Sequence, residues 1–99
     1  MASRKSEWKI TKISNSARRH INTLDSSSQM ALIGQFDRLQ ENPFRINIKK
    51  VEGKKNIYRG RLGDIRYYFR ISSEIKSIEI LMVDSRGQIK RKSIQRLKD

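Results

Sequence analysis

Five side chains on one face of a predicted β-hairpin have the chemistry to bind an anion. Gly63-Asp64 is suited to a tight two-residue turn, and glycine at its first position favours type II′. Counting outward from this turn places Arg61 opposite Arg66. Because successive side chains of a strand point to opposite faces, one face of the hairpin carries Arg59, Arg61, Arg66, Tyr68 and Arg70. Like charges directly opposite each other cost stability, so folding alone does not favour this arrangement. The pattern indicates an anion-binding surface, or else a solvated face whose arginines splay apart or pair with Glu79 or an acidic partner.

The overall charge of the chain indicates the same kind of ligand. Lysine and arginine total 23 of the 99 residues against 10 aspartates and glutamates, which gives a formal net charge of +13. Such an excess repels itself unless an anion offsets it, and nucleic acid is the first partner to consider. Ribosomal proteins, proteins that bind anionic membranes and some small scaffolds share this charge balance. The charge therefore predicts a polyanionic partner without identifying it.

The composition also limits the size and the compartment of the protein. A chain of 99 residues with 35% hydrophobic content forms one domain with a modest core. It has no cysteine, which excludes disulfides and thiolate metal sites and suits a reducing cytosol. No apolar run approaches the roughly 20 residues that span a bilayer, and residues 1–6 lack the apolar region of a signal peptide. We expect a cytoplasmic protein without membrane contact and with residues 1–6 as a flexible basic tail.

Hydrophobic periodicity predicts the elements that hold the arginines. A strand is expected over residues 7–13 and a helix over 15–24. Ser26 and Gln29 have the spacing of a capping box for a second helix, which ends before Pro43. The two helices form a helical hairpin.

Beyond the helical hairpin the period changes to two and predicts four strands. They lie around residues 46–48, over 57–62 and 65–71, and over 77–83. The hairpin should bury a core face made of Tyr58, Gly60, Leu62, Ile65, Tyr67, Phe69 and Ile71. The last strand is apolar on both faces, as in a central strand, with Ile78, Ile80 and Met82 on one face and Leu81 and Val83 on the other. The order βααββββ predicts an α+β fold with the helical hairpin packed on a mainly antiparallel sheet.

At residues 58–66, YRGRLGDIR, the sequence resembles the RelE/ParE toxin superfamily, and in particular RelE-like mRNA interferases. The resemblance extends upstream through LQENP at 39–43 and KVEG at 50–53. It extends downstream through IEIL at 78–81 and DSRG at 84–87. It covers roughly residues 7–91, which we interpret as a RelE-like toxin domain, and leaves 92–99 as a basic extension that is either a short helix or disordered.

The resemblance implies an activity and a set of catalytic residues. RelE toxins cleave messenger RNA at the ribosomal A site without a metal or another cofactor, by attack of a ribose 2′-hydroxyl on the adjacent phosphate. Carried over residue by residue, the catalytic set is Arg59, Arg61, Arg66, Arg86 and Lys90. Lys90 stands where many RelE proteins have a tyrosine. Guanidinium groups held on strands stabilise the negative charge that builds on the phosphate. Arg86 or Arg66 is the candidate proton donor, and Lys90 either acts as a base or binds phosphate.

Six further residues are expected to bind RNA: Lys49, Lys50, Lys54, Tyr68, Arg70 and Arg91. The ring of Tyr68 either stacks on a base or packs under the C-terminal segment. His20 is interpreted as a surface residue away from the sheet, and Asp64 and Asp84 as turn residues, so no metal site is expected.

The resemblance also implies partners. They are a cognate antitoxin that lays a helix or strand over the sheet, and messenger RNA on the ribosome with ribosomal RNA contacts. Two other functions stay open. One is ParE-like inhibition of DNA gyrase, which has no stated need for the four arginines. The other is binding of RNA or the ribosome without catalysis, which the lysine at position 90 would fit.

Overall fold

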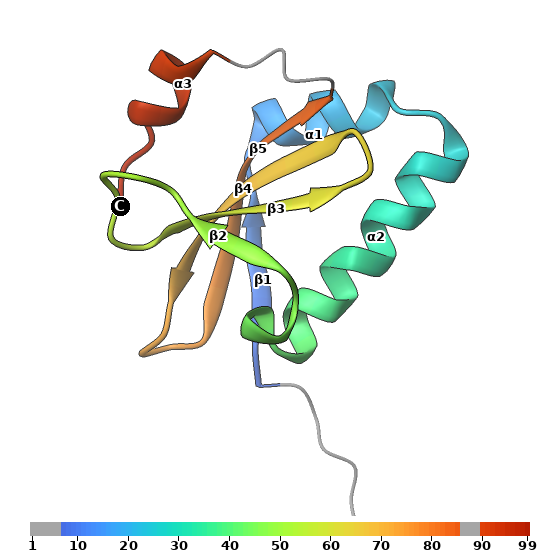
Figure 1. Ribbon diagram of the computed structural model, residues 1–99. Coiled ribbons are helices and arrows are strands. Elements are labelled where there is room, and N and C mark those ends of the chain that lie inside the picture. Colours follow the sequence, from blue (N-terminus) through green and yellow to red (C-terminus); the bar gives the residue numbers. More distant parts are fainter. Residues whose placement is uncertain (1–6, 86–89) are drawn as a thin grey trace, which may run out of the picture.

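The computed structural model describes residues 7–85 and 90–99, which contain one sheet with helices on both faces (Figure 1). The strands are β1 (Lys9–Ile13), β2 (Ile48–Lys50), β3 (Ile57–Leu62), β4 (Ile65–Ser72) and β5 (Ser77–Ser85). Their order in the sheet is β1-β5-β4-β3-β2. β1 runs parallel to β5, and the other neighbouring pairs are antiparallel. The mainly antiparallel sheet is thus confirmed, as is the interior position of the last strand.

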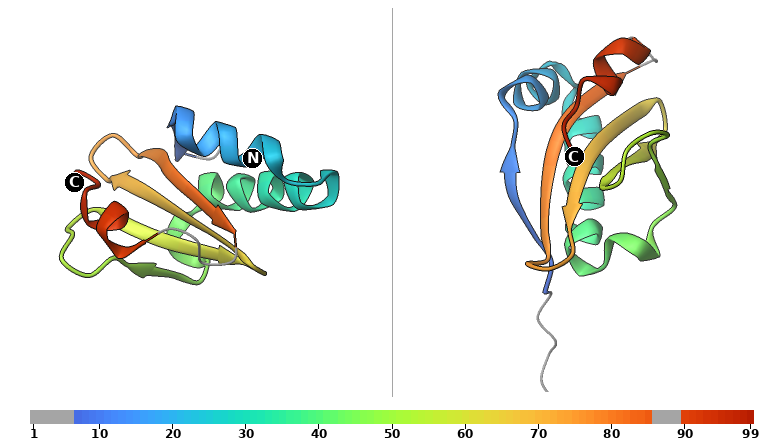
Figure 2. Two further views of the ribbon diagram at one scale, coloured as in Figure 1. Left: turned by 90° about the horizontal axis from the view of Figure 1, so that it is seen from above. Right: turned by 90° about the vertical axis from the view of Figure 1, so that its left-hand side faces the viewer.

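The helices divide between the two faces of the sheet. α1 (Asn15–Thr23) and α2 (Ser26–Glu41) form the helical hairpin, and the 3-10 turn η1 (Pro43–Arg45) follows α2. Side chains of α1 and α2 join the core with residues of β4 and β5. The short helix α3 (Arg91–Gln95) lies across the opposite face (Figure 2). The α+β class is confirmed, and the C-terminal extension is partly helical.

Both helices of the hairpin begin at a residue whose side chain caps the first turn. The Ser14 hydroxyl accepts a hydrogen bond from the Ala17 backbone N–H at 3.0 Å. Asp25 caps α2, because its Oδ1 accepts from the Ser28 N–H at 2.9 Å. The predicted capping box with Ser26 as the cap is therefore wrong by one position, since a carboxylate directly before it fills that role.

The β3–β4 hairpin has the predicted register. Leu62 pairs with Ile65 and Arg61 with Arg66, and the pairing continues to Tyr58 with Phe69. Gly63 has a φ of 61°, and among the described non-glycine residues only Lys76 has a positive φ. A positive φ at the first turn position alone is the signature of the predicted type II′ turn.

β5 contains a bulge that the sequence pattern did not predict. Tyr68 pairs with Met82 whereas Phe69 pairs with Ile80, so Leu81 is an extra residue on β5. The bulge reverses the alternation and buries Val83 on the core face together with Ile78 and Ile80. The predicted grouping of Met82 with Ile78 and Ile80 is wrong for this reason.

Tyr67 lies at the centre of the core. Its ring is fully buried, with ring centroids 5.6 Å from Phe69 and 5.5 Å from Phe36. Its hydroxyl accepts a hydrogen bond from Gln35 Nε2 at 3.0 Å. The ring crosses directly over Gly60, where an added Cβ would lie 2.1 Å from Tyr67 Cζ. Glycine is required at position 60 by this close approach.

Candidate functional site

The arginine face, defined as Arg59, Arg61, Arg66, Tyr68 and Arg70, forms as the hairpin register predicts. β3 contributes the first two residues and β4 the other three. Arg70 pairs with Glu79, and within the described part of the chain Arg59, Arg61 and Arg66 enter no salt bridge. Pairing with Glu79 therefore accounts for one arginine, and three guanidinium groups are available to an external anion.

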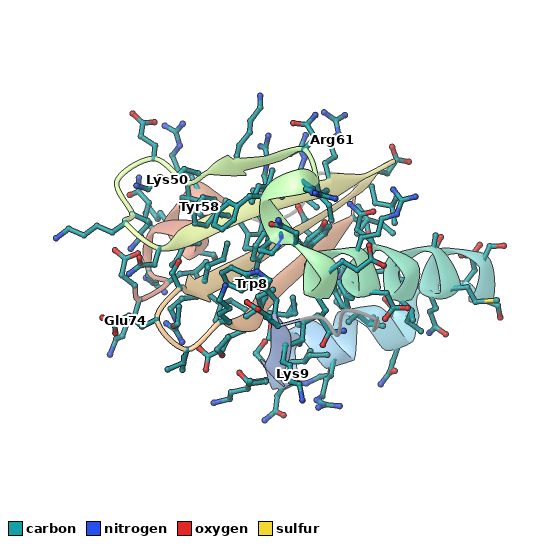
Figure 3. All side chains as sticks on the ribbon, turned by 90° about the horizontal axis from the view of Figure 1, so that it is seen from below. Trp8, Lys9, Lys50, Tyr58, Arg61 and Glu74 are labelled. Atoms are coloured by element: carbon teal, nitrogen blue, oxygen red, sulfur yellow. The ribbon has the colours of Figure 1, made fainter. Side chains whose placement is uncertain are left out.

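One acidic residue lies far from this cluster, and another is buried in the sheet beside it. Figure 3 shows Arg61 and Glu74 at opposite ends of the sheet. Asp84, which the sequence analysis assigned to a turn, instead lies within β5 opposite Arg66 and is 1% exposed. The predicted turn position is wrong because β5 continues to Ser85. The sequence feature that marked Asp84 was a single carboxylate after an apolar run. The buried carboxylate offsets part of the positive charge from within the sheet.

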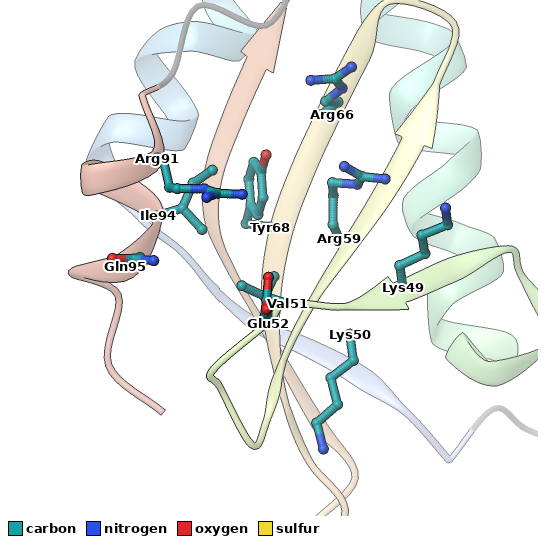
Figure 4. Close-up of a pocket in the computed structure, with 10 residues that line it drawn as sticks. All are labelled: Lys49, Lys50, Val51, Glu52, Arg59, Arg66, Tyr68, Arg91, Ile94 and Gln95. Carbon is teal, nitrogen blue, oxygen red and sulfur yellow. The ribbon is translucent and has the colours of Figure 1, made fainter.

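A cavity of about 340 Å³ opens between the arginine face and α3 (Figure 4). This volume is at the small end of the range for ligand pockets in proteins. The cavity is lined by Lys49, Lys50, Val51, Glu52, Arg59, Arg66, Tyr68, Arg91, Ile94 and Gln95. Cations from four separate elements thus converge around a partly apolar floor, a combination that fits one nucleotide unit with its phosphate.

Tyr68 occupies the middle of this floor. It is 4% exposed, and Val51 and Ile94 line the cavity beside it, so packing beneath the C-terminal segment is the interpretation that the structure supports. Burial raises the pKa of the Tyr68 phenol above its usual 10.0, while the cations of Arg59 and Arg66 oppose the rise. The phenol is therefore neutral and lies between positive charges.

The C-terminal segment, residues 90–99, is held in place through its backbone carbonyls and the Asp99 carboxylate. Lys54 Nζ donates to the carbonyls of Gln95 and Leu97 at 2.7 and 2.5 Å, and Arg70 Nη1 donates to that of Lys98 at 2.5 Å. Asp99 Oδ1 accepts from the backbone N–H groups that precede β3, Lys55 and Asn56, both at 2.9 Å. A basic segment can dock on a basic face because it presents carbonyl oxygens there.

The structure brings together part of the predicted site. Arg59 and Arg66 share the cavity with four of the six predicted RNA-binding residues, Lys49, Lys50, Tyr68 and Arg91. The other two, Lys54 and Arg70, hold the C-terminal segment. Arg61 and Lys90 are exposed and lie outside the cavity lining, the latter directly before α3. Arg86 falls outside the described residues.

The lone histidine is placed differently from the prediction. His20 Nε2 lies 2.8 Å from the hydroxyl of Ser85 at the end of β5, so the helix carries it against the sheet. In the described part of the chain, no group of three or more His, Cys, Asp or Glu residues is placed to hold a metal ion. None of the described helices is long and apolar enough to cross a bilayer.

The protein is a small α+β protein whose five-stranded sheet has a helical hairpin on one face. The other face of the sheet is basic and holds an arginine-lined cavity. No protein-family model matches the sequence, and no curated protein matches it significantly. Solved structures do match.

The archaeal RelE in its complex with RelB from Pyrococcus horikoshii is similar with a TM-score of 0.71 and 25% identity, over 84% of this chain and 99% of that one. The RelBE2 toxin–antitoxin complex from Mycobacterium tuberculosis is similar with a TM-score of 0.72 and 24% identity, over 88% and 100%. The isolated Escherichia coli RelE toxin gives a TM-score of 0.66 and 19% identity, over 85% and 90%. The chain has a RelE-like toxin fold.

Proposed function

We propose that this chain is the toxin of a type II toxin–antitoxin pair and that it cleaves messenger RNA at the ribosomal A site. The observation that carries the proposal is the cavity in which Arg59 and Arg66 converge with Lys49 and Arg91. Lys49 lies directly opposite Arg59 across β2 and β3, a like-charge pair that folding alone does not favour, so a phosphate is the ligand that offsets the repulsion. The RelE-like fold supports the toxin assignment.

The chemistry follows from where the charges are held. A ribose 2′-hydroxyl attacks the adjacent phosphate, the P–O5′ bond breaks, and negative charge accumulates on the phosphate oxygens. Arg59 and Arg66, fixed on strands, stabilise that charge without reorganising. Arg61 and the sequence-predicted Arg86 and Lys90 complete the proposed catalytic set, the last as a phosphate ligand on the RNA path. The reaction needs neither a metal nor another cofactor.

The proposed partners are an antitoxin and messenger RNA on the ribosome, in the cytoplasm. The similar structures are a RelE–RelB complex from P. horikoshii and the toxin–antitoxin complex RelBE2 from M. tuberculosis, which supports a partner protein for this chain. An antitoxin that presents carboxylates to the arginine face would occupy the same cations as RNA. Antitoxin and RNA would then exclude each other.

The test is induction of the protein in growing cells, followed by mapping of messenger RNA 5′ ends. We expect growth arrest with new ends inside codons at the A site. The double variant Arg59→Gln, Arg66→Gln should lose the arrest at equal protein level. Arg19→Gln is the matched control, because Arg19 is an exposed cation of α1 on the opposite face of the sheet.

Other outcomes would redirect the assignment. Arrest with intact messenger RNA and a DNA-damage response would replace the proposal with gyrase inhibition. Binding to ribosomes without cleavage would leave a non-catalytic binding protein, for which the lysine at position 90 is the supporting feature. Full toxicity of the double variant would remove the arginine face from the mechanism.

A further inference from the structure

The cleavage step in the proposed function needs a proton donor that the cations of the site do not readily provide. The departing 5′ oxygen must be protonated, and a guanidinium group holds its proton too tightly to be a good acid near neutral pH. Lys90 is exposed and does not line the cavity. The donor must therefore be sought among the neutral groups at the cavity floor.

The Tyr68 hydroxyl is such a group. Tyr68 is paired across the strands with Arg59, and Arg66 lies two residues before it on the same face of β4. Figure 4 shows its hydroxyl end directed along β4 toward Arg66, with Arg59 on one side of the ring and Arg91 on the other. The hydroxyl thus lies in the cavity that Arg59, Arg66 and Arg91 line (Figure 4), which is where the proposed function places the scissile phosphate.

We propose that Tyr68 is a catalytic residue that donates the proton to the 5′ oxygen as the phosphorus–oxygen bond breaks, an inference that rests on the proposed function. The bond between the 2′ oxygen and phosphorus forms, and the bond between phosphorus and the 5′ oxygen breaks. The Tyr68 proton moves to the 5′ oxygen. The 2′-hydroxyl proton leaves to water, and water returns a proton to the tyrosinate. The products are a 2′,3′-cyclic phosphate and a 5′-hydroxyl.

The surroundings of Tyr68 fit both halves of this cycle. Burial raises the pKa of the phenol, so the hydroxyl keeps its proton at neutral pH until an alkoxide develops beside it. The nearby Arg59 and Arg66 cations then stabilise the tyrosinate that remains. An ordinary phenol is a stronger acid than a guanidinium, and the burial that raises the pKa of Tyr68 narrows this difference while the Arg59 and Arg66 cations widen it.

The decisive variant is Tyr68→Phe, which removes the hydroxyl and keeps the buried ring. Its matched control is Tyr58→Phe, since Tyr58 lies on the other face of the same hairpin and stacks on Phe69 at 6.1 Å. Cleavage is measured on ribosomes programmed with a short messenger RNA, with single-turnover kinetics and a separate binding measurement. We expect Tyr68→Phe to bind like the wild type and to cleave about 10² to 10⁴-fold more slowly. Tyr58→Phe should cleave at the wild-type rate.

A second substrate identifies the role of the hydroxyl. A bridging 5′-phosphorothiolate at the cleaved position has a thiolate leaving group, which departs without a proton because thiols ionise near pKa 8.5. Wild type and Tyr68→Phe should cleave this substrate at equal rates. A deficit that persists on the thiolate substrate, or a wild-type rate for Tyr68→Phe on the natural one, would overturn the inference. A wild-type protein that cleaves neither substrate would instead overturn the proposed function.

Discussion

Replacing Gly60 with alanine should destabilise the fold more than any other single methyl addition to the described glycines. The new Cβ would lie 2.1 to 2.4 Å from three atoms of the Tyr67 side chain, two in the ring and the hydroxyl oxygen. That ring cannot withdraw, because it is fully buried between Phe36 and Phe69. Overpacking of a core typically costs about 1–3 kcal/mol, and we expect the upper end, about 3 kcal/mol. With an m-value near 1.5 kcal/mol per molar, the urea midpoint should fall by about 2 M.

The assay is equilibrium unfolding in urea followed by the fluorescence of Trp8, the single tryptophan, which is 9% exposed and packs edge-on against Phe44. Gly34→Ala is the control. An added Cβ there meets nothing within 4 Å, and alanine stabilises an exposed helix by about 1 kcal/mol relative to glycine. A Gly60→Ala protein as stable as the wild type would refute the packing argument. The argument would also fail if Gly60→Ala lowered the free energy of unfolding as much in a Tyr67→Leu protein, which lacks the ring, as it does in the wild type.

Three further predictions concern the arginine face, the C-terminal segment and α1. Arg61→Gln should raise the free energy of unfolding by about 0.2–1 kcal/mol, since it removes the like-charge pair of Arg61 with Arg66 and leaves Arg66 opposite the buried Asp84, while it weakens RNA binding; a loss of stability would contradict this. The pKa of the Asp99 carboxyl is lowered by the backbone N–H groups of Asn56 and Lys55, so its contact is formed above the usual value of 3.8 and lost as the pH falls through the folded-state pKa. The amide NMR signals of Lys55 and Asn56 should therefore titrate together in acid and stay unchanged from pH 5 to neutral. Ser14→Ala should cost about 1–2 kcal/mol in thermal unfolding, because Ser14 caps α1 and its hydroxyl also donates to the Leu81 carbonyl at 2.7 Å; an unchanged midpoint would show that the cap contributes nothing.

The parts of the fold that local rules decide could be predicted from sequence. Gly63-Asp64 fixes the turn, the turn fixes the pairing of Arg61 with Arg66, and strand alternation then assigns the whole arginine face. The bulge at Leu81 could not be predicted, because β5 is apolar on both faces and its hydrophobic pattern is the same in either register. Strand alternation is informative only where polar and apolar residues differ between faces.

The parts of the site that depend on distant polar contacts could not be predicted. Lys54 and Arg70 looked like RNA ligands by charge and by face, but they bind backbone carbonyls of residues more than 25 positions away. Carbonyl acceptors are common to every residue, so no sequence pattern marks the ones that will be used. The burial of Tyr68 follows from the same docking, as Ile94 reaches it only once the C-terminal segment is in place.

The parallel pairing of β1 with β5 has a consequence for when the protein becomes able to act. Lys9 pairs with Ser77, which lies 68 positions later in the chain, so the first strand is synthesised well before its partner exists. At synthesis rates of 5–20 residues per second this delay is roughly 3 to 14 s. Long-range closures of this kind also form late in folding, because their loop entropy must be overcome first. A nascent chain therefore cannot complete the sheet that carries its arginines while its own ribosome is still translating β5.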